Sequence, residues 1–459
     1  MNASQSIAAY AARLSYEALP APAVDAVKRD VLDTLATALG GSARPGVLAV
    51  VELAQSWESK PEATSLVYGS RMAAPLAALC NGTMAHALDF DDTFDFGPPF
   101  HTGVAVVPAA LAAAEHLGGA SGKELIPAIA AGIDLMCRLS RATTAGLRGW
   151  HLTSLYGYLG SALASGMLLR LSEEQLLNAL GIAYSQCAGN LRCINDGALS
   201  KRLQAGLAAK GGLLAAQLAQ RGVTGAHDIF EGENSLFPVY FRGEYDPTPL
   251  TEKLGVRFDV TNLSFKPWPA CRATHPFIEA SLRLMQEQNI KPEQIAEVTA
   301  APPIFFEPSD VKRRPRTIVD AQFSVPYTMA VALVKGAVKI EDFTEESIRN
   351  EQVLALAARI GCRELPDRVE RYQTYVKDAI VEVKTRDGRT LSQSVGWVYG
   401  HPENPMSWES LAAKFRDCAA WSVKPISPQA VEQAIGFLAQ LEREPDVRPL
   451  IRLLSGEAR

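Results

Sequence analysis

The segment PAVDAVKRDVLDTLATALGG, residues 22–41, sets the fold class of this chain. Its apolar residues recur at intervals of three and four, which is the spacing of one face of an α-helix. The segment GKELIPAIAAGIDLMCRL at residues 122–139 repeats the pattern, and Gly or Pro separates such segments from Ser4 to about Arg221. Their Ala-rich faces allow helices to approach one another closely. The sequence therefore predicts a mainly α fold that begins with a large helical domain.

The pattern changes in the second half of the chain, where residues 266–400 are typical of a smaller α+β domain. Helices are expected from about Thr274 to Gln288 and near residues 324–336, and an alternating stretch starts at Ile295. Asp387-Gly388 stands between two alternating runs, which is a strong signal for a β-hairpin.

The chain ends with two or three amphipathic helices after the linker HPENPMS, which begins at His401. We expect these helices to pack back onto the first domain. Residues 1–265 and 401–459 would then form one all-helical domain made by both chain ends, and residues 266–400 would be an inserted α+β lid domain.

Composition excludes several classes of partner. The 459 residues include 45 Lys or Arg and 50 Asp or Glu, so the net charge of −5 argues against nucleic acid. The longest smooth apolar run, residues 103–114, is much shorter than the ~20 residues that cross a bilayer, and the N-terminus lacks a signal-peptide pattern. Seven Cys without metal-binding spacing are typical of free thiols in a reducing compartment. We therefore expect a cytoplasmic protein without a membrane or nucleic-acid partner.

The densest polar cluster lies in NGTMAHALDFDDTFDFGPPFHTG, residues 81–103. It follows an apolar helix and contains His86, Asp89, Asp91, Asp92, Asp95 and His101. On a continuing helix His86, Asp89 and Asp92 would share one face. Because the helix dipole disfavours acidic residues at a helix C-terminus, the cluster favours a functional role over a solvated helix end.

One alternative for this cluster is a magnesium-diphosphate site. Residues 91–95, DDTFD, match the DDxxD motif of all-helical isoprenoid synthases, and Mg²⁺ favours carboxylate oxygens. Such enzymes need a second metal-binding helix. The nearest candidate, Asn195-Asp196 followed by Ser200, has the wrong spacing and no Glu four residues later. The few aromatic residues also argue against a prenyl pocket.

Three further segments carry cations and bases: RGWHLTSLYG with His151, LSKRLQAGLAAKGG with Lys201 and Arg202, and FKPWPACRATH with Lys266, Cys271, Arg272 and His275. Each residue alone is more typical of a structural role. Together they supply the cations that a small polyanion requires. The chain lacks a phosphate loop, a dinucleotide fingerprint, a nucleophile elbow and HExxH, so we expect no cofactor and no metal.

These segments together resemble the MmgE/PrpD family, which includes 2-methylcitrate dehydratase, cis-aconitate decarboxylase and iminodisuccinate epimerase. The resemblance rests on AHALDFDDT, the later His in a Pro/Gly loop, Gly-x-His-x-Thr, Ser-Lys-Arg-Leu and Lys-Pro-x-Pro-x-Cys-Arg-x-x-His, in that order along the chain. It implies a helical domain made by both chain ends, an inserted α+β lid, a site between them without a required metal, and a homodimer.

The resemblance also implies the site residues. Catalysis would use Asp89, His101, His151, Lys201 and Lys266, and we assign substrate binding to Asp92, Thr93, Arg202, Cys271, Arg272 and His275. Three features depart from the relatives. Cis-aconitate decarboxylases place a histidine at the position of Cys271, relatives often show His at Gln204, and the FDFGPPF loop is longer here. The missing histidine argues against decarboxylation of cis-aconitate.

The family chemistries share the problem of stabilising negative charge on a carbon next to a carboxylate, which cations solve. Lys201 and Lys266 would hold the carboxylates, His101 and His151 would move protons, and Asp89 would orient a histidine or lysine. The leading hypothesis is a cofactor-independent lyase or epimerase acting on a small di- or tricarboxylate by α-proton transfer. The alternatives are a cis-aconitate decarboxylase and, from another class, a carboxylate-binding protein without turnover.

Overall fold

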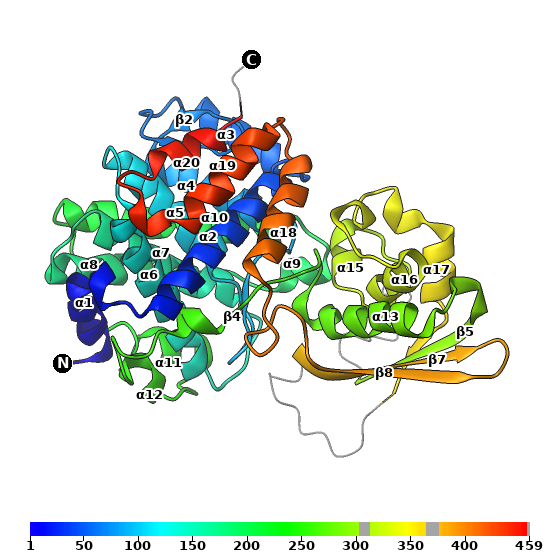
Figure 1. The fold of residues 1–459 in the computed structure, drawn as a ribbon. Coiled ribbons are helices and arrows are strands. Elements are labelled where there is room, and N and C mark those ends of the chain that lie inside the picture. Colours follow the sequence, from blue (N-terminus) through cyan, green and yellow to red (C-terminus); the bar gives the residue numbers. More distant parts are fainter. Residues whose placement is uncertain (303–312, 364–375, 457–459) are drawn as a thin grey trace.

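The protein is mainly α-helical (Figure 1), and its buried hydrophobic residues form two separate cores. The computed structural model describes residues 1–302, 313–363 and 376–456. The larger core is built almost entirely from residues before 266 and after 400, and the second core from residues 270–398. The predicted fold class, a large helical part with a smaller α+β unit, is confirmed.

Helices from both ends of the chain surround the larger core. Those before residue 266 are α1 (Ala3–Arg13), α2 (Ala21–Gly41), α3 (Val47–Ser56), α4 (Ala74–Ala85), α5 (Gly103–His116), α6 (Gly122–Ala142), α7 (Leu152–Leu168), α8 (Glu173–Tyr184), α9 (Arg192–Asn195), α10 (Ser200–Gln220), α11 (Leu236–Phe241) and α12 (Thr248–Thr251). The C-terminal helices α18 (Trp408–Ala420), α19 (Pro428–Ala439) and α20 (Arg448–Leu453) pack against the same body, as predicted (Figure 1).

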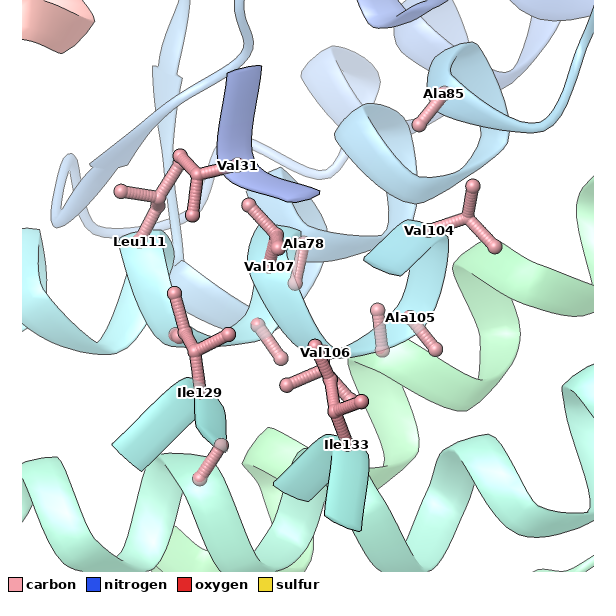
Figure 2. Packing of buried hydrophobic residues seen from close by; sticks show 14 of the residues in the cluster. Val31, Ala78, Ala85, Val104, Ala105, Val106, Val107, Leu111, Ile129 and Ile133 are labelled. Atoms are coloured by element: carbon pink, nitrogen blue, oxygen red, sulfur yellow. The ribbon is translucent and has the colours of Figure 1, made fainter. Parts of the chain in front are cut away.

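Small side chains let the central helices pack closely. Residues 104–107 of α5 lie among side chains of α2, α4 and α6 (Figure 2). Gly206 of α10 faces α4, where an added Cβ would lie 2.3 Å from the Leu79 carbonyl oxygen. A larger residue there would force the two helices apart, so the low aromatic content follows from the packing.

Lys414 of α18 links the C-terminal helices to the centre of the molecule. Its Nζ lies 2.6 Å from Oδ1 of Asp33 in α2. The same ammonium donates to the carbonyl oxygens of Phe90, at 2.6 Å, and Lys266, at 3.0 Å. One buried side chain from near the chain end therefore fixes two segments that, as shown below, carry the candidate site.

The second core lies between a four-stranded sheet and short helices. The strands are ordered β6-β5-β7-β8, with β5 and β6 parallel and the other pairs antiparallel. The elements are α13 (His275–Gln288), β5 (Ile295–Ala301), α15 (Ile318–Gln322), α16 (Val325–Lys335), α17 (Glu351–Ala357), β6 (Ile360–Cys362), β7 (Lys377–Thr385) and β8 (Thr390–Trp397). The Asp387-Gly388 hairpin joins β7 to β8 as predicted, and Gly388 has the positive φ of +90° that favours glycine. Figure 1 shows α13 lying along one face of this sheet.

Two short pairings of two-residue strands complete the described part of the structure. β1 (Ala63–Thr64) pairs with β2 (Arg71–Met72), and β3 (Thr93–Phe94) pairs with β4 (Leu263–Ser264). We propose the division of the chain at residues 265 and 400, which the two separate cores support. Within the described ranges, every helix is too short or too polar to cross a bilayer.

Candidate active site

The polar cluster begins where α4 ends, at Ala85. His86 caps the helix and the chain then turns, so His86, Asp89 and Asp92 do not share a helical face, and that expectation was wrong. Asp89 adopts a left-handed backbone with φ of +52°, which is uncommon for a residue other than glycine. Backbone strain of this kind collects at functional sites, where the surrounding contacts hold it in place.

Asp89 holds two buried lysines. Its Oδ1 lies 3.0 Å from Nζ of Lys266 and 3.2 Å from Nζ of Lys201. Burial would raise the pKa of Asp89, but the two ammonium groups outweigh it and lower the pKa below its ordinary value. Burial likewise opposes the charge of Lys266, yet Asp89 raises the pKa of Lys266. Lys266 is therefore held as a cation beside the ionised carboxylate of Asp89, which also contacts Lys201.

Asp91 joins two histidine rings. Its Oδ2 lies 2.9 Å from Nδ1 of His86 and 2.8 Å from Nδ1 of His101. His101 Nδ1 also lies 2.7 Å from the carbonyl oxygen of Asp92. Because carboxylate and carbonyl oxygens only accept, this geometry places a proton on Nδ1 of His101 and leaves Nε2 able to accept one. Burial opposes the charge of Asp91, but His101 and His86 hold the pKa of this carboxyl well below its usual range.

A third histidine ring completes the cluster. The ring centroids of His86 and His101 are 4.7 Å apart, and those of His86 and His151 are 5.6 Å apart. Burial, with the charge of Lys201, lowers the pKa of His86 to about 4 and lowers that of His151 well below its ordinary value. His86 accepts from Lys201 through Nε2 at 2.9 Å. Both rings are thus neutral near pH 7.

A cavity of about 240 Å³ opens onto these groups between the helical body and the start of the second core. All five residues assigned to catalysis line it: Asp89, His101, His151, Lys201 and Lys266. Thr93, Cys271 and Arg272 line it as well, and Phe323 closes one side. The side-chain oxygen of Thr93 and Nη2 of Arg272 are buried and have no hydrogen-bond partner among the residues that the structure describes. These two polar atoms are available to a ligand in the cavity.

Cys271 faces the cavity as a neutral thiol. Burial, together with the charge of Asp89, raises the pKa of Cys271 to about 11. Arg272 is held beside it by Asp95, whose Oδ2 lies 3.2 Å from Nε of the guanidinium.

Three assigned residues lie away from this cavity. Asp92 accepts from the backbone N–H groups of Thr102 and Gly103 at the start of α5, which gives it a capping role. His275 is fully buried, with Nε2 3.1 Å from the carbonyl oxygen of Ala270. Arg202 lines a second cavity beside the first. The geometry therefore does not support direct substrate contact by these three residues in the first cavity.

The three carboxylates of the DDxxD motif, residues 91–95, have different partners in the structure. Asp91 contacts two histidines, Asp92 caps α5, and Asp95 accepts from Arg272 and Ser264. These three carboxylates do not converge, so they do not form a magnesium-diphosphate site. His86, Asp91 and His101 do bring three ligand atoms within 4.8 Å of one another. A metal ion bound there would compete with the two Nδ1 protons that Asp91 accepts.

The sequence reasoning did not assign His86, Asp91 or Lys414 to the site. His86 and Asp91 stood in the quoted polar cluster, and buried carboxylate–histidine pairs were the signal that could have singled them out. Lys414 carried no local signal, since its partners are hundreds of residues away.

Comparison with known proteins identifies the family. A family model for the MmgE/PrpD N-terminal domain matches residues 5–248, and one for the MmgE/PrpD C-terminal domain matches residues 268–437. The chain belongs to the MmgE/PrpD family. The predicted family is therefore confirmed.

This MmgE/PrpD chain is similar along nearly its whole length to several named relatives. A cis-aconitate decarboxylase-like protein of Aspergillus oryzae is 26% identical and covers 99% of this chain and 98% of its own length. The cis-aconitate decarboxylases of Mus musculus and Homo sapiens are each 28% identical, covering 94% of this chain and 88% and 89% of their own lengths.

Proposed function

We propose that this MmgE/PrpD protein is a cofactor-independent lyase or epimerase that transfers a proton at the carbon next to a carboxylate of a small di- or tricarboxylate. The observation that carries the proposal is the cavity in which Lys201, Lys266, His101 and His151 meet. A polyanionic substrate needs cations to bind it, and a proton-transfer reaction needs acids and bases. The lysines of this cavity supply the cations, and its histidines supply the acids and bases.

The lysines would stabilise charge. A carboxylate that draws electrons from the neighbouring carbon gains a second negative charge, and fixed cations lower the cost of that step. Lys201 and Lys266 are held by Asp89 before substrate arrives, so they need little reorganisation. The free Nη2 of Arg272 offers a further donor to a second carboxylate of the substrate.

His101 would act as the base. The contact of Nδ1 with Asp91 fixes the ring and its tautomer, and Nε2 lies 3.6 Å from the nearest carboxylate oxygen of Asp89, beyond hydrogen-bond distance. A substrate C–H placed in the cavity would meet this nitrogen. His151, whose Nδ1 has no hydrogen-bond partner within the described ranges, or the neutral thiol of Cys271 would return a proton from another direction.

A second candidate is decarboxylation of cis-aconitate, favoured by the names of the relatives. Cys271 stands where those enzymes are expected to carry histidine, which argues for a different final protonation step. We further propose a cytoplasmic homodimer, as the family resemblance implies; light scattering would test the dimer.

Incubation with a panel of di- and tricarboxylates in D₂O tests the function. Deuterium at the α-carbon with inversion and no alkene supports an epimerase, new absorbance near ~240 nm supports a dehydratase, and release of CO₂ supports a decarboxylase. Ligand binding without any product across the panel would favour a binding protein and contradict the proposal. His101→Ala and Lys201→Ala should each abolish the reaction, and full turnover in both would refute the assignment of the site.

A further inference from the structure

A second cavity, of about 230 Å³, lies on the other side of Lys201 and is lined by two arginines. Arg44 and Arg202 come from the helical body, while Thr317, Gln322 and Phe343 come from the segment that follows residue 266. We call it the arginine cavity. Its walls thus belong to both parts of the chain.

Neither arginine has a carboxylate partner in the part of the chain that the structure describes. Arg202 is 6% exposed, and its Nη1 donates to the carbonyl oxygen of Pro45 at 3.1 Å. Arg44 donates to the carbonyl oxygens of Phe343 and Ile340 at 3.3 and 3.4 Å. Carbonyl groups orient the two guanidinium groups. The charge of Asp89 acts on Arg202 from outside this cavity, and Arg44 lies over the ring of Trp421, 5.5 Å from its centroid, so neither arginine is neutralised by direct contact with a carboxylate of the described residues.

The two arginines also oppose each other. Burial, and next the charge of Arg44, lower the pKa of Arg202 to about 10, which reports the cost of placing two cations in one desolvated cavity. Glu345 lies at the edge, but it is ion-paired with Arg349 at 3.1 Å and its side chain is 61% exposed. A buried and a half-buried guanidinium group that share one cavity without direct carboxylate contact are an arrangement that an oxyanion would neutralise.

The arginine cavity is separate from the catalytic one. A space of only about 10 Å³, lined by Lys201, Arg202, Gln322 and Phe323 among others, lies between them. It is too small to pass a carboxylate or phosphate without movement of these side chains. An anion beside Arg44 and Arg202 would therefore be a second ligand.

We propose that the arginine cavity binds a small oxyanion, a phosphate or a polycarboxylate, as a ligand distinct from the substrate. Because its walls come from both parts of the chain, the bound anion joins the helical body to the segment carrying Phe323. That segment also closes the catalytic cavity. Occupancy of the second site therefore favours the arrangement in which the catalytic cavity is closed.

Binding stoichiometry of inorganic phosphate and, separately, of citrate tests the proposal, measured by calorimetry on the full chain. We expect two anion sites in the wild type. Lys201→Met should remove the catalytic one, and Arg44→Gln should weaken the other by about tenfold or more, since one charged hydrogen-bond donor is lost. Arg71→Gln, which removes the same charge beside Glu115, is the matched control and should keep both sites.

Several outcomes would overturn the proposal. A single anion site in the wild type, loss of both sites in Lys201→Met, or two unchanged sites in Arg44→Gln would each show that the arginine cavity holds no separate ligand. Arg202→Gln should repeat the effect of Arg44→Gln; because Arg44 is less buried, its variant carries the test if Arg202→Gln does not fold. Binding of phosphate alone or citrate alone identifies which kind of oxyanion the site prefers.

Discussion

Asp89 presents both its backbone carbonyl and its carboxylate to the ammonium of Lys266, at 2.7 and 3.0 Å. Asp89 makes these two contacts with its backbone in the left-handed conformation. One residue thus sets the position of the lysine through main chain and side chain together, and the same carboxylate reaches Lys201.

Asp89→Asn should destabilise the fold strongly. It leaves the ammonium of Lys266, which is fully buried, without a carboxylate, and breaking one side of a buried ion pair costs about 3–5 kcal/mol. Urea unfolding measures the loss. Asp25→Asn, which breaks the exposed pair with Arg29, is the control and should cost no more than about 1 kcal/mol. Equal effects of the two variants would contradict the role of Asp89.

Asp91→Asn should impair turnover without removing the cavity. The asparagine amide can donate to Nδ1 of His101 and favour the other tautomer, so we expect a fall in kcat of at least about 100-fold. Nitrogen NMR of the His101 ring checks the cause directly, because the proton should move from Nδ1 to Nε2. A variant with normal kcat and an unchanged tautomer would exclude Asp91 as the orienting group.

Stability should fall as the pH drops below the ordinary histidine range. The pKa of His86 is lowered to about 4 in the folded protein, so between about pH 6.5 and pH 4 the unfolded chain binds a proton that the native state does not. The unfolding free energy therefore decreases with falling pH, by up to about 1.4 kcal/mol per unit for this group. Urea titrations across that range should show a shallower slope for His86→Gln than for wild type or for a variant of the exposed His227.

Alkylation should reveal the protonated state of Cys271. Since its pKa is raised to about 11, the rate of modification by iodoacetamide should rise about tenfold per pH unit between ~7 and ~9, without a plateau. Mass spectrometry of the peptide containing Cys271 follows the reaction. A plateau below pH ~9 would mean that Lys266 outweighs burial and that the residue is a thiolate.

The substitution Cys271→His tests the proposal that this position separates this protein from its decarboxylase relatives. An imidazole at this wall of the cavity would add a base or proton donor beside Lys266, so release of CO₂ from cis-aconitate should appear or increase. Cys271→Ser, which adds no base, should not change it. Carbon-13 NMR of labelled cis-aconitate gives the measurement, and equal CO₂ release from the two variants would show that this position does not select the reaction.

Much of the fold could be predicted because it depends on local periodicity. The pattern of residues 22–41 became α2, and that of residues 122–139 became α6. The Asp387-Gly388 turn was recognisable because its backbone geometry requires these residue types. Boundaries differed by a few residues, where capping groups decide the end of a helix.

The site was harder to predict because it depends on the directions of the backbone and side chains, which the spacing of residues in the sequence does not give. The helix ends at Ala85 and the chain then turns, with a left-handed residue at Asp89, so His86 and Asp91 come together although no helical face joins them. Lys201 and Arg202 are neighbours in sequence, but successive side chains on a helix do not face the same way, and each lines a different cavity. Side-chain direction, more than residue type, limited the prediction.

The contacts of Lys414 affect the order in which parts of the protein can fold during synthesis. A polypeptide emerges from the ribosome with its N-terminus first, so Phe90 and Lys266 are exposed to the cell long before α18 is synthesised. Until then, the carbonyl groups of both residues lack the ammonium that binds them together. We therefore expect a nascent chain to form most of its helices before α18 is made, and the two segments that carry the candidate site to be fixed to each other only near the end of translation.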